Sequence, residues 1–249
     1  MTWVLDLDGV VWLAGRAIRG SSEAVARLRR AGEQVVFLTN NSGPTLADYV
    51  DALARVGIAA SPDDLATSAQ AAARLVESGA RVSVLGGAGL HEALAARGVE
   101  EVPSSDRPSA VVVGRTVTLD YDELAAAATA IRAGARFVAT NTDSTFPTPE
   151  GLLPGAGAMV AFLQVASGRA PEVAGKPQQP SVDLVRDRFG TPGVMVGDRP
   201  DTDGRFARMA GARFALVLSG VTGRDDLPVE PAPDAVADDL AGIVDRLLA

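Results

Sequence analysis

Short apolar runs alternate with amphipathic stretches along most of this 249-residue chain. Residues 3–5 and 34–38 predict two strands, and the stretch between them from Ser21 to about Arg30 predicts a helix that Gly32 ends. A strand, a helix and a second strand in this order are typical of a parallel βαβ unit. The start of the chain therefore predicts a doubly wound sheet with helices on both faces.

The alternation continues to the end of the chain. A second helix is expected to end near Val56, before Gly57, and residues 61–77 predict another helix. The remaining predicted strands are 82–85, 111–113, 137–140, 193–196 and 214–218. The remaining predicted helices are 90–97, 121–132, 158–166, 181–189, 240–248 and one that follows Gly204. Residues 146–157 and 228–233, which are rich in Pro and Gly or in Pro alone, predict loops.

The middle of the chain differs from its two ends in the spacing of these elements. We interpret residues 1–67 and 172–249 as one doubly wound α/β core, and residues 68–171 as a smaller α/β domain inserted into it. A chain of this length is long enough for a core that carries an inserted second domain.

Composition and charge exclude several classes of function. The net charge is −8 and basic residues form only short clusters such as 27–30, so nucleic acid is not an expected partner. The chain has no Cys, which excludes thiol nucleophiles and thiolate metal sites. No run approaches the ~18 apolar residues of a membrane span, and the start of the chain lacks a signal-peptide pattern. We therefore expect a cytoplasmic protein without a membrane partner, whose single histidine, His91, is an ordinary surface or capping residue.

Two carboxylates follow the first predicted strand, because Asp6 and Asp8 stand just before Gly9. Residues two apart in a strand share a face, so the two carboxylates repel each other unless a cation lies between them. A divalent ion is the natural occupant of such an oxygen-only site. One carboxylate could then attack an electrophile while the other transfers protons. The open alternative is a solvated strand end that leads into a turn.

Polar clusters also follow two other predicted strands: residues 39–42, and Asp198 together with Asp203. Ligands of open parallel sheets bind beyond the carboxyl ends of the strands, so these clusters are expected to meet in one pocket. Lys176 would add an ammonium group that neutralises a phosphoryl group. Taken singly, Thr39 could be a loop hydroxyl, Lys176 an exposed turn lysine and Asp203 a surface acid.

Four segments resemble the four motifs of the haloacid dehalogenase (HAD) superfamily in order and spacing. They are Asp6-Leu7-Asp8-Gly9, Thr39 after an apolar strand, Lys176 before Pro177, and Gly197-Asp198-Arg199-x-x-Thr202-Asp203. Residues 37–42, 139–143 and 175–177 are also similar to the branch that contains 4-nitrophenyl phosphatase, phosphoglycolate phosphatase and pyridoxal phosphatase. The resemblance spans nearly the whole chain, and it implies a HAD-like Rossmannoid core with residues 68–171 as a large α/β cap.

The resemblance also implies roles for the residues that match these motifs. Asp6 is the expected nucleophile, which forms an aspartyl-phosphate, and Asp8 the expected acid and base. Magnesium would be held by Asp6, the backbone carbonyl of Asp8, and Asp198. Phosphoryl oxygens would be bound by Thr39, the backbone of Asn40 and Lys176. Asp203 would hold the metal or Lys176 in position without itself contacting the substrate.

Substrate selectivity is expected to lie on the cap surface that faces the pocket. Asn40, Asn41 and the cap residues Asn141 and Asp143 are candidate substrate contacts, although residues 140–143 could equally form a simple turn. The sequence does not identify the alcohol part of the substrate.

The functional hypothesis is a magnesium-dependent phosphatase that hydrolyses phosphomonoesters of small metabolites such as glycerol phosphate or phosphoglycolate. Two alternatives are a phosphotransferase of the same fold, which passes the phosphoryl group to an acceptor alcohol, and a non-catalytic sensor of phosphorylated ligands. Relatives that dimerise through the cap make a homodimer a further hypothesis, which the sequence does not decide.

Overall fold

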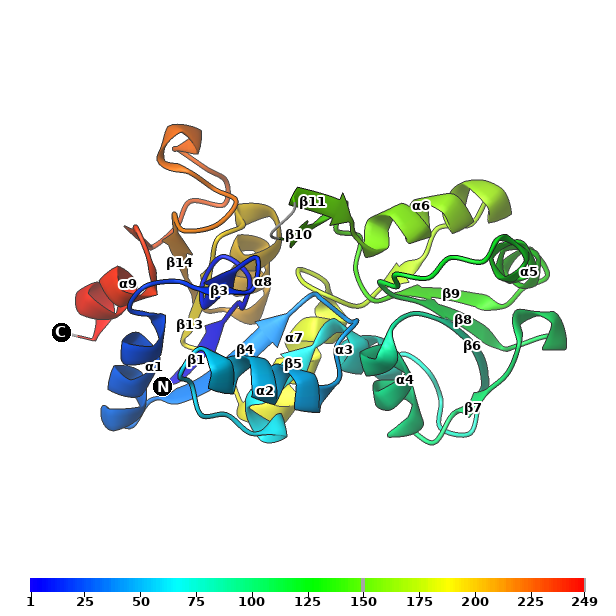
Figure 1. Cartoon of the computed structure of the whole chain (residues 1–249), viewed down its shortest axis with the longest axis horizontal. Helices are drawn as coiled ribbons and strands as arrows, with labels where there is room; N and C mark the ends of the chain where they lie inside the picture. Colours follow the sequence, from blue (N-terminus) through cyan, green and yellow to red (C-terminus); the bar gives the residue numbers. More distant parts are fainter. Residues whose placement is uncertain (149–150, 249) are drawn as a thin grey trace. The chain divides into compact units, whose positions relative to one another are not determined.

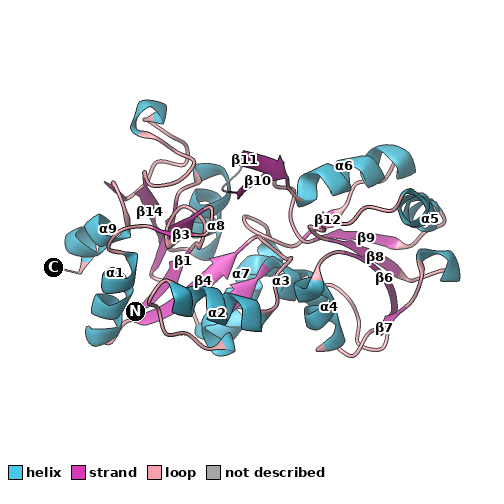
Figure 2. Ribbon diagram, viewed as in Figure 1, coloured by secondary structure: helices cyan, strands magenta, loops and turns pink. Residues whose placement is uncertain are grey.

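The computed structural model describes residues 1–148 and 151–248 (Figures 1 and 2). The described residues form two compact units. One unit, here called the core unit, comprises Met1–Thr39, Ala47–Ala66 and Lys176–Ala249, and the other, called the cap unit, comprises Asn40–Leu46 and Thr67–Gly175. The short segment Asn40–Leu46 therefore packs with the inserted part of the chain, although it directly follows a strand of the core.

The core unit is built on a six-stranded sheet of described residues, in the order β15-β14-β13-β1-β4-β5. Its strands are β1 (Thr2–Leu5), β4 (Gln34–Thr39), β5 (Leu65–Thr67), β13 (Val194–Gly197), β14 (Arg213–Val217) and β15 (Ala235–Ala237). β1 runs parallel to both of its neighbours, so Leu5 lies opposite Phe37 of β4 and Val196 of β13. All four residues of β1 are buried, as expected for a central strand with both faces covered.

Helices cover both faces of the core sheet (Figure 1). The core helices are α1 (Ser21–Arg30), α2 (Leu46–Arg55), α7 (Gln179–Phe189), α8 (Arg205–Ala210) and α9 (Leu240–Leu247). α1 packs against α9, and α7 packs against α8. α1 buries Ala24, Val25 and Leu28, which recur at helical spacing, and its other face is polar. The predicted doubly wound sheet is confirmed.

The cap unit contains a second parallel sheet, in the order β12-β9-β8-β6-β7. Its strands are β6 (Arg81–Leu85), β7 (Glu100–Glu101), β8 (Ala110–Val113), β9 (Arg136–Ala139) and β12 (Glu172–Val173). α3 (Ser68–Arg74) packs against α4 (Ala88–Ala95), and α5 (Tyr121–Arg132) packs against α6 (Ala156–Ser167). The prediction of a smaller α/β cap, inserted into the core, is confirmed.

The predicted helix over residues 61–77 is wrong in its first half. A 3₁₀ turn (Pro62–Asp64) leads into strand β5, and α3 begins only at Ser68. All three residues of β5 are buried at the sheet edge, a tertiary contact that outweighs local helix propensity. Thr67 then caps α3: its hydroxyl accepts from the backbone N–H of Gln70, and the Gln70 side chain accepts from the N–H of Thr67.

Several short strands lie where loops or no strands are expected. β10 (Thr145–Thr148) pairs antiparallel with β11 (Gly151–Pro154), and residues 149 and 150 of the predicted loop lie outside the described residues. β2 (Trp12–Leu13) pairs with β3 (Arg16–Ala17) shortly after the first predicted motif. β15 follows the proline-rich stretch. None of the helices formed by the described residues is long and apolar enough to cross a membrane.

Candidate active site

Parallel register brings three polar strand ends to one edge of the core sheet. Asp6 directly follows β1, Thr39 is the last residue of β4, and Asp198 directly follows β13. β1 lies between the other two strands, and Leu5 is in register with a residue near the end of each. The carboxyl edge of an open parallel sheet is the usual place for a ligand. The side chains of Asp6, Thr39 and Asp198 are all buried at this edge.

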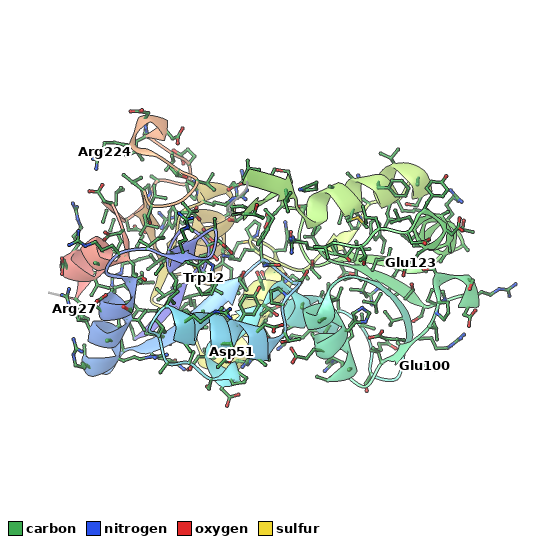
Figure 3. The ribbon with its side chains drawn as sticks, viewed as in Figure 1. Trp12, Arg27, Asp51, Glu100, Glu123 and Arg224 are labelled. Carbon is green, nitrogen blue, oxygen red and sulfur yellow. The ribbon has the colours of Figure 1, made fainter. Side chains whose placement is uncertain are left out.

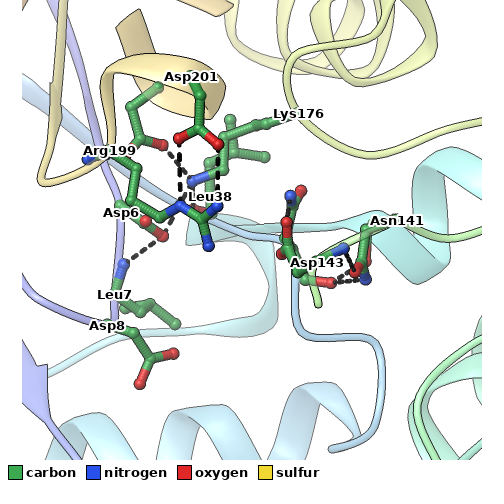
Figure 4. Close-up of polar contacts among 12 residues, drawn as sticks. Asp6, Leu7, Asp8, Leu38, Asn141, Asp143, Lys176, Arg199 and Asp201 are labelled. Carbon is green, nitrogen blue, oxygen red and sulfur yellow. Dashed lines mark hydrogen bonds and ion pairs between the residues drawn. The ribbon is translucent and has the colours of Figure 1, made fainter. Parts of the chain in front are cut away.

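Lys176 lies between two carboxylates (Figure 4). Its Nζ atom is 2.9 Å from Oδ1 of Asp6 and 2.7 Å from Oδ1 of Asp203, and it also donates to the backbone carbonyl of Leu38 at 3.2 Å. The Lys176 side chain is 1% exposed and that of Asp203 is fully buried. The predicted lysine is therefore part of an enclosed ionic cluster and not an exposed turn residue.

Asp203 is held in place by the turn that follows β13. Residues Pro200–Gly204 form a π-helical turn, in which the N–H of Asp203 donates to the carbonyl of Arg199 at 2.8 Å. The N–H of Arg199 donates in turn to Oδ2 of Asp203 at 3.1 Å. A Cβ atom added to Gly197 would overlap the Asp203 carboxylate, so this position requires glycine. Asp203 is therefore a buried partner of Lys176, and not the surface acid that its position alone would allow.

Asp198 occupies a space that two glycines leave open. Its Oδ2 atom accepts a hydrogen bond from the backbone N–H of Val221 at 2.6 Å. A Cβ atom on either Gly9 or Gly220 would overlap this carboxylate. Gly9 has φ of +82°, a conformation that other residues rarely adopt. Glycine is therefore needed at position 9 for two reasons: it allows the backbone conformation of the turn, and it leaves room for the Asp198 carboxylate.

The electrostatics of the cluster favour a cation. Burial raises the pKa of Asp6 well above its usual value, Lys176 opposes this shift, and the carboxylates of Asp203 and Asp198 add to it. Burial and the charge of Asp203 likewise raise the pKa of Asp198 to about 7, against the opposing hydrogen bond from Val221. Burial alone would lower the pKa of Lys176, but Asp203 and Asp6 outweigh it, so this pKa lies above its usual value and the ammonium keeps its charge.

The same carboxylates can hold a metal ion. Among residues 1–148 and 151–248, Asp6, Asp198 and Asp203 form the one group of His, Cys, Asp and Glu side chains able to bind a metal, with ligand oxygens within 4.8 Å of one another. When these three and Lys176 are ionised, three negative charges and one positive charge leave a net charge of −2 in a buried site. A divalent cation would neutralise it, and oxygen ligands are those that magnesium prefers. The cluster therefore fits a magnesium ion.

Asp8 lies apart from this ionic cluster. The prediction that Asp6 and Asp8 share one face of a strand is wrong. β1 ends at Leu5, so strand alternation does not orient these two side chains. Asp6 points toward Lys176, whereas the carboxylate of Asp8 points away from it (Figure 4). Oδ1 of Asp8 accepts a hydrogen bond from the indole Nε1 of Trp12 at 3.1 Å. The two carboxylates thus have different surroundings, as different chemical roles require.

The predicted substrate contacts belong to a hydrogen-bonded network inside the cap unit. The carbonyl of Asn40 accepts from Nδ2 of Asn141 at 2.6 Å and from Oγ of Ser68 at 2.5 Å. Nδ2 of Asn40 donates to Oδ2 of Asp143 at 3.2 Å, and Oδ1 of Asn141 accepts from the N–H of Asp143 at 3.0 Å. Asn141 is buried and Asp143 half-buried. Asn41 accepts from the N–H of Gly43 within the same segment.

Sequence analysis missed three groups that touch these residues. They are the indole of Trp12 on Asp8, the backbone N–H of Val221 on Asp198, and the carbonyl of Leu38 on Lys176. Two of them are backbone atoms, which every residue has, so no sequence signal could identify them. Trp12 offers a weak signal, because an aromatic donor follows Asp8 by four positions.

Comparisons with known proteins agree with this geometry. The chain matches two family models: haloacid dehalogenase-like hydrolase over residues 3–100, and HAD-hydrolase-like over residues 173–243. The first match contains Asp6, Asp8 and Thr39, and the second contains Lys176 and Asp198. The two models thus cover the segments that supply the core-unit residues of the site.

Individual proteins match over most of the chain. D-glycerol 3-phosphate phosphatase of Mycobacterium tuberculosis is 39% identical over 250 residues, which cover 96% of this chain and 70% of that protein. The crystal structure of a glycerol phosphate phosphatase from M. tuberculosis in complex with magnesium has a TM-score of 0.91 at 38% identity, covering 97% of this chain and 75% of that one. p-Nitrophenyl phosphatase from Archaeoglobus fulgidus has a TM-score of 0.91 at 30% identity, covering 99% and 98%.

Proposed function

Because the chain belongs to the haloacid dehalogenase-like hydrolases, in the branch of the 4-nitrophenyl and glycerol phosphate phosphatases, we propose that its substrate is the phosphomonoester of a small metabolite such as glycerol phosphate or phosphoglycolate. The chain is a HAD-type phosphatase that acts on phosphomonoesters. The observation that carries the proposal is the buried cluster in which Lys176 contacts Asp6 and Asp203 beside Asp198.

In the proposed reaction, Asp6 is the nucleophile. Its carboxylate oxygen attacks phosphorus, and the bond from phosphorus to the alcohol oxygen breaks as the new bond forms. Asp8 donates a proton to the departing oxygen, then takes a proton from a water molecule that attacks the aspartyl-phosphate and releases Asp6. Its hydrogen bond with Trp12 supports this assignment, because proton transfer needs a carboxyl group in a defined orientation.

Lys176, Thr39 and Asn40 are the proposed phosphoryl-binding groups. The ammonium of Lys176 is held charged by Asp203 and would attract the anionic ester while also orienting Asp6. Thr39 is the last residue of β4, which lies beside β1, and Asn40 is the next residue in the chain. The proposed magnesium ligands are Asp6, Asp198 and the backbone carbonyl of Asp8, with Asp203 in support. A bound magnesium ion would offset the negative charge of the ester and of Asp6.

We assign residues 1–67 and 172–249 as the catalytic core and residues 68–171 as the cap that selects the substrate. The division of labour supports this assignment, because Asp6, Lys176 and Asp198 come from the core unit, whereas Asn141 and Asp143 come from the cap unit. Asn40, Asn41, Asn141 and Asp143 are proposed to contact the substrate. Selectivity through the cap would let one catalytic core serve different alcohols.

A hydrolysis screen tests the proposal. The protein with magnesium is expected to release phosphate from 4-nitrophenyl phosphate and, within a panel of phosphorylated metabolites, to prefer a small ester such as glycerol phosphate or phosphoglycolate. Asp6→Asn and removal of divalent ions by chelation should each abolish phosphate release. Turnover that survives either treatment would contradict the mechanism. Recovery of a phosphorylated acceptor alcohol in place of free phosphate would instead indicate phosphoryl transfer.

The proposal extends to assembly and location. We propose a homodimer formed through the cap, supported by exposed apolar side chains on that unit at Leu119, Tyr121 and Val165. Light scattering should then give about twice the chain mass of 25.5 kDa, and a mass equal to one chain would contradict the dimer. A cytoplasmic location follows from the substrate class, because charged phosphate esters are retained there. Cell fractionation tests it.

A further inference from the structure

Trp12 contacts the proposed acid directly. It begins β2, just after the loop that carries Asp8, and its indole Nε1 donates to Oδ1 of Asp8 at 3.1 Å. Figure 3 labels the Trp12 side chain on the part of the ribbon near the start of the chain, where the ribbon is blue. Only 8% of Trp12 is exposed, so packing limits the freedom of the ring. A hydrogen bond to one carboxyl oxygen limits the rotation of that carboxyl group.

Backbone hydrogen bonds hold the loop that joins these two residues. The carbonyl of Leu7 accepts from the N–H groups of Val11 at 2.9 Å and Trp12 at 3.2 Å. The N–H of Gly9 donates to the carbonyl of Trp12 at 2.7 Å, and Oγ of Ser219 donates to the carbonyl of Gly9 at 2.6 Å. The loop is thus fixed independently of the indole, so replacing the indole removes one side-chain contact without removing the loop's own support.

We propose that Trp12 is a positioning residue, which orients the carboxyl group of Asp8 for proton transfer. Oδ1 accepts the indole N–H, so the proton to be transferred is directed to Oδ2. As the bond between Asp6 and phosphorus forms and the ester P–O bond breaks, the electron pair of that bond moves to the alcohol oxygen, and the Oδ2 proton moves to the same oxygen. This inference rests on the proposed function, in which Asp8 is the acid.

The basicity of the leaving group distinguishes this role from a structural one. An alkoxide is a strong base, so an alkyl ester needs the proton of Asp8 while its bond breaks. The 4-nitrophenolate anion is a weak base and leaves without it. kcat/KM reports the steps up to the first irreversible one, here formation of the aspartyl-phosphate. A misoriented Asp8 should therefore lower kcat/KM for alkyl esters much more than for 4-nitrophenyl phosphate.

The second tryptophan provides a matched control. Trp3 is completely buried in β1, and its indole Nε1 has no hydrogen-bond partner among the described residues. Trp12→Phe should lower kcat/KM for glycerol phosphate about tenfold, a fraction of the full effect of general acid catalysis, while changing that for 4-nitrophenyl phosphate by less than about threefold. Trp3→Phe removes the same atoms without touching Asp8, so it should leave the ratio of the two kcat/KM values unchanged.

Fluorescence gives a test that does not depend on turnover. The chain has two tryptophans, so Trp3→Phe leaves Trp12 as the only one, and Trp12→Phe leaves Trp3. Adding Asp8→Asn should shift the emission of Trp12, because its carboxyl acceptor becomes an amide. The emission of Trp3 should not change.

The outcomes separate this inference from the proposed function. If Asp8→Asn leaves alkyl-ester hydrolysis intact, the proposed function fails and the inference fails with it. If Asp8→Asn abolishes that hydrolysis while Trp12→Phe and Trp3→Phe give the same ratio, the positioning role alone is overturned. An unchanged Trp12 emission after Asp8→Asn would also overturn it.

Discussion

Nζ of Lys176 lies 2.7 Å from Oδ1 of Asp203, and neither side chain is more than 1% exposed. The same ammonium contacts Asp6 at 2.9 Å, so Asp203 and the proposed nucleophile share one counter-ion. A buried charge that loses its partner is costly, which makes this pair sensitive to substitution on either side.

Asp203→Asn is expected to destabilise the protein strongly. Removing one partner of a buried ion pair typically costs about 3–5 kcal/mol, and the loss should lie toward the lower value here because Lys176 keeps its contact with Asp6. The loss should appear as a lower free energy of unfolding in urea. Asp201→Asn is the matched control, because Asp201 lies in the same turn and pairs with Arg199, but its side chain is 58% exposed. An exposed pair contributes at most about 1 kcal/mol. Equal losses in the two variants would contradict the buried-pair account.

Gly9→Ala is expected to abolish magnesium binding. The added Cβ would overlap the carboxylate of Asp198 and displace this proposed ligand. Gly15→Ala controls for backbone strain, because Gly15 has a similar φ of +75° but no atom within 4 Å of the added Cβ. Magnesium affinity, measured by calorimetry, should fall in the first variant alone. If both variants lose affinity equally, strain and not displacement of Asp198 is the cause.

Stability without metal is expected to fall as pH rises from about 4 to about 7. The pKa of Asp198 is raised to about 7 in the folded protein, so the folded state binds a proton in this range that the unfolded state has lost. Magnesium binding requires the deprotonated carboxylate, so the stabilisation that magnesium provides should grow with pH over the same range. Thermal melts with and without magnesium measure both effects. Asp198→Asn should weaken both trends, and Asp6, whose pKa is also raised, should account for what remains. Trends of unchanged size in this variant would exclude Asp198 as a source.

Asn141→Ala is expected to lower stability, whereas Asp143→Ala should chiefly alter selectivity. The Asn141 side chain is buried and bonds the Asn40 carbonyl at 2.6 Å, so its loss should cost about 1–3 kcal/mol. Asp143 is only half-buried, which leaves it accessible to a substrate. Urea unfolding and kcat/KM ratios across several phosphate esters separate the two effects. Full stability in Asn141→Ala would contradict the structural role of Asn141 and leave only its proposed contact with substrate.

Local sequence signals were reliable where the structure depends on periodicity. Alternating apolar and amphipathic stretches predicted four of the six described core strands, and most of the core helices, close to their observed bounds. The exceptions depend on partners far along the chain. β5 is an example, because its burial at the sheet edge overrides the helix that residues 61–77 predict.

Local periodicity and spacing were enough to predict the doubly wound core, its inserted cap, and the order of the motifs at the strand ends. Which side chains meet at the site depends on long-range packing. Lys176 reaches a carbonyl 138 positions earlier in the chain, and Asp203 proved to be a buried partner and not a surface acid. The reason is physical: periodicity specifies which face of an element is buried, whereas the packing of distant elements specifies which side chains share the buried space.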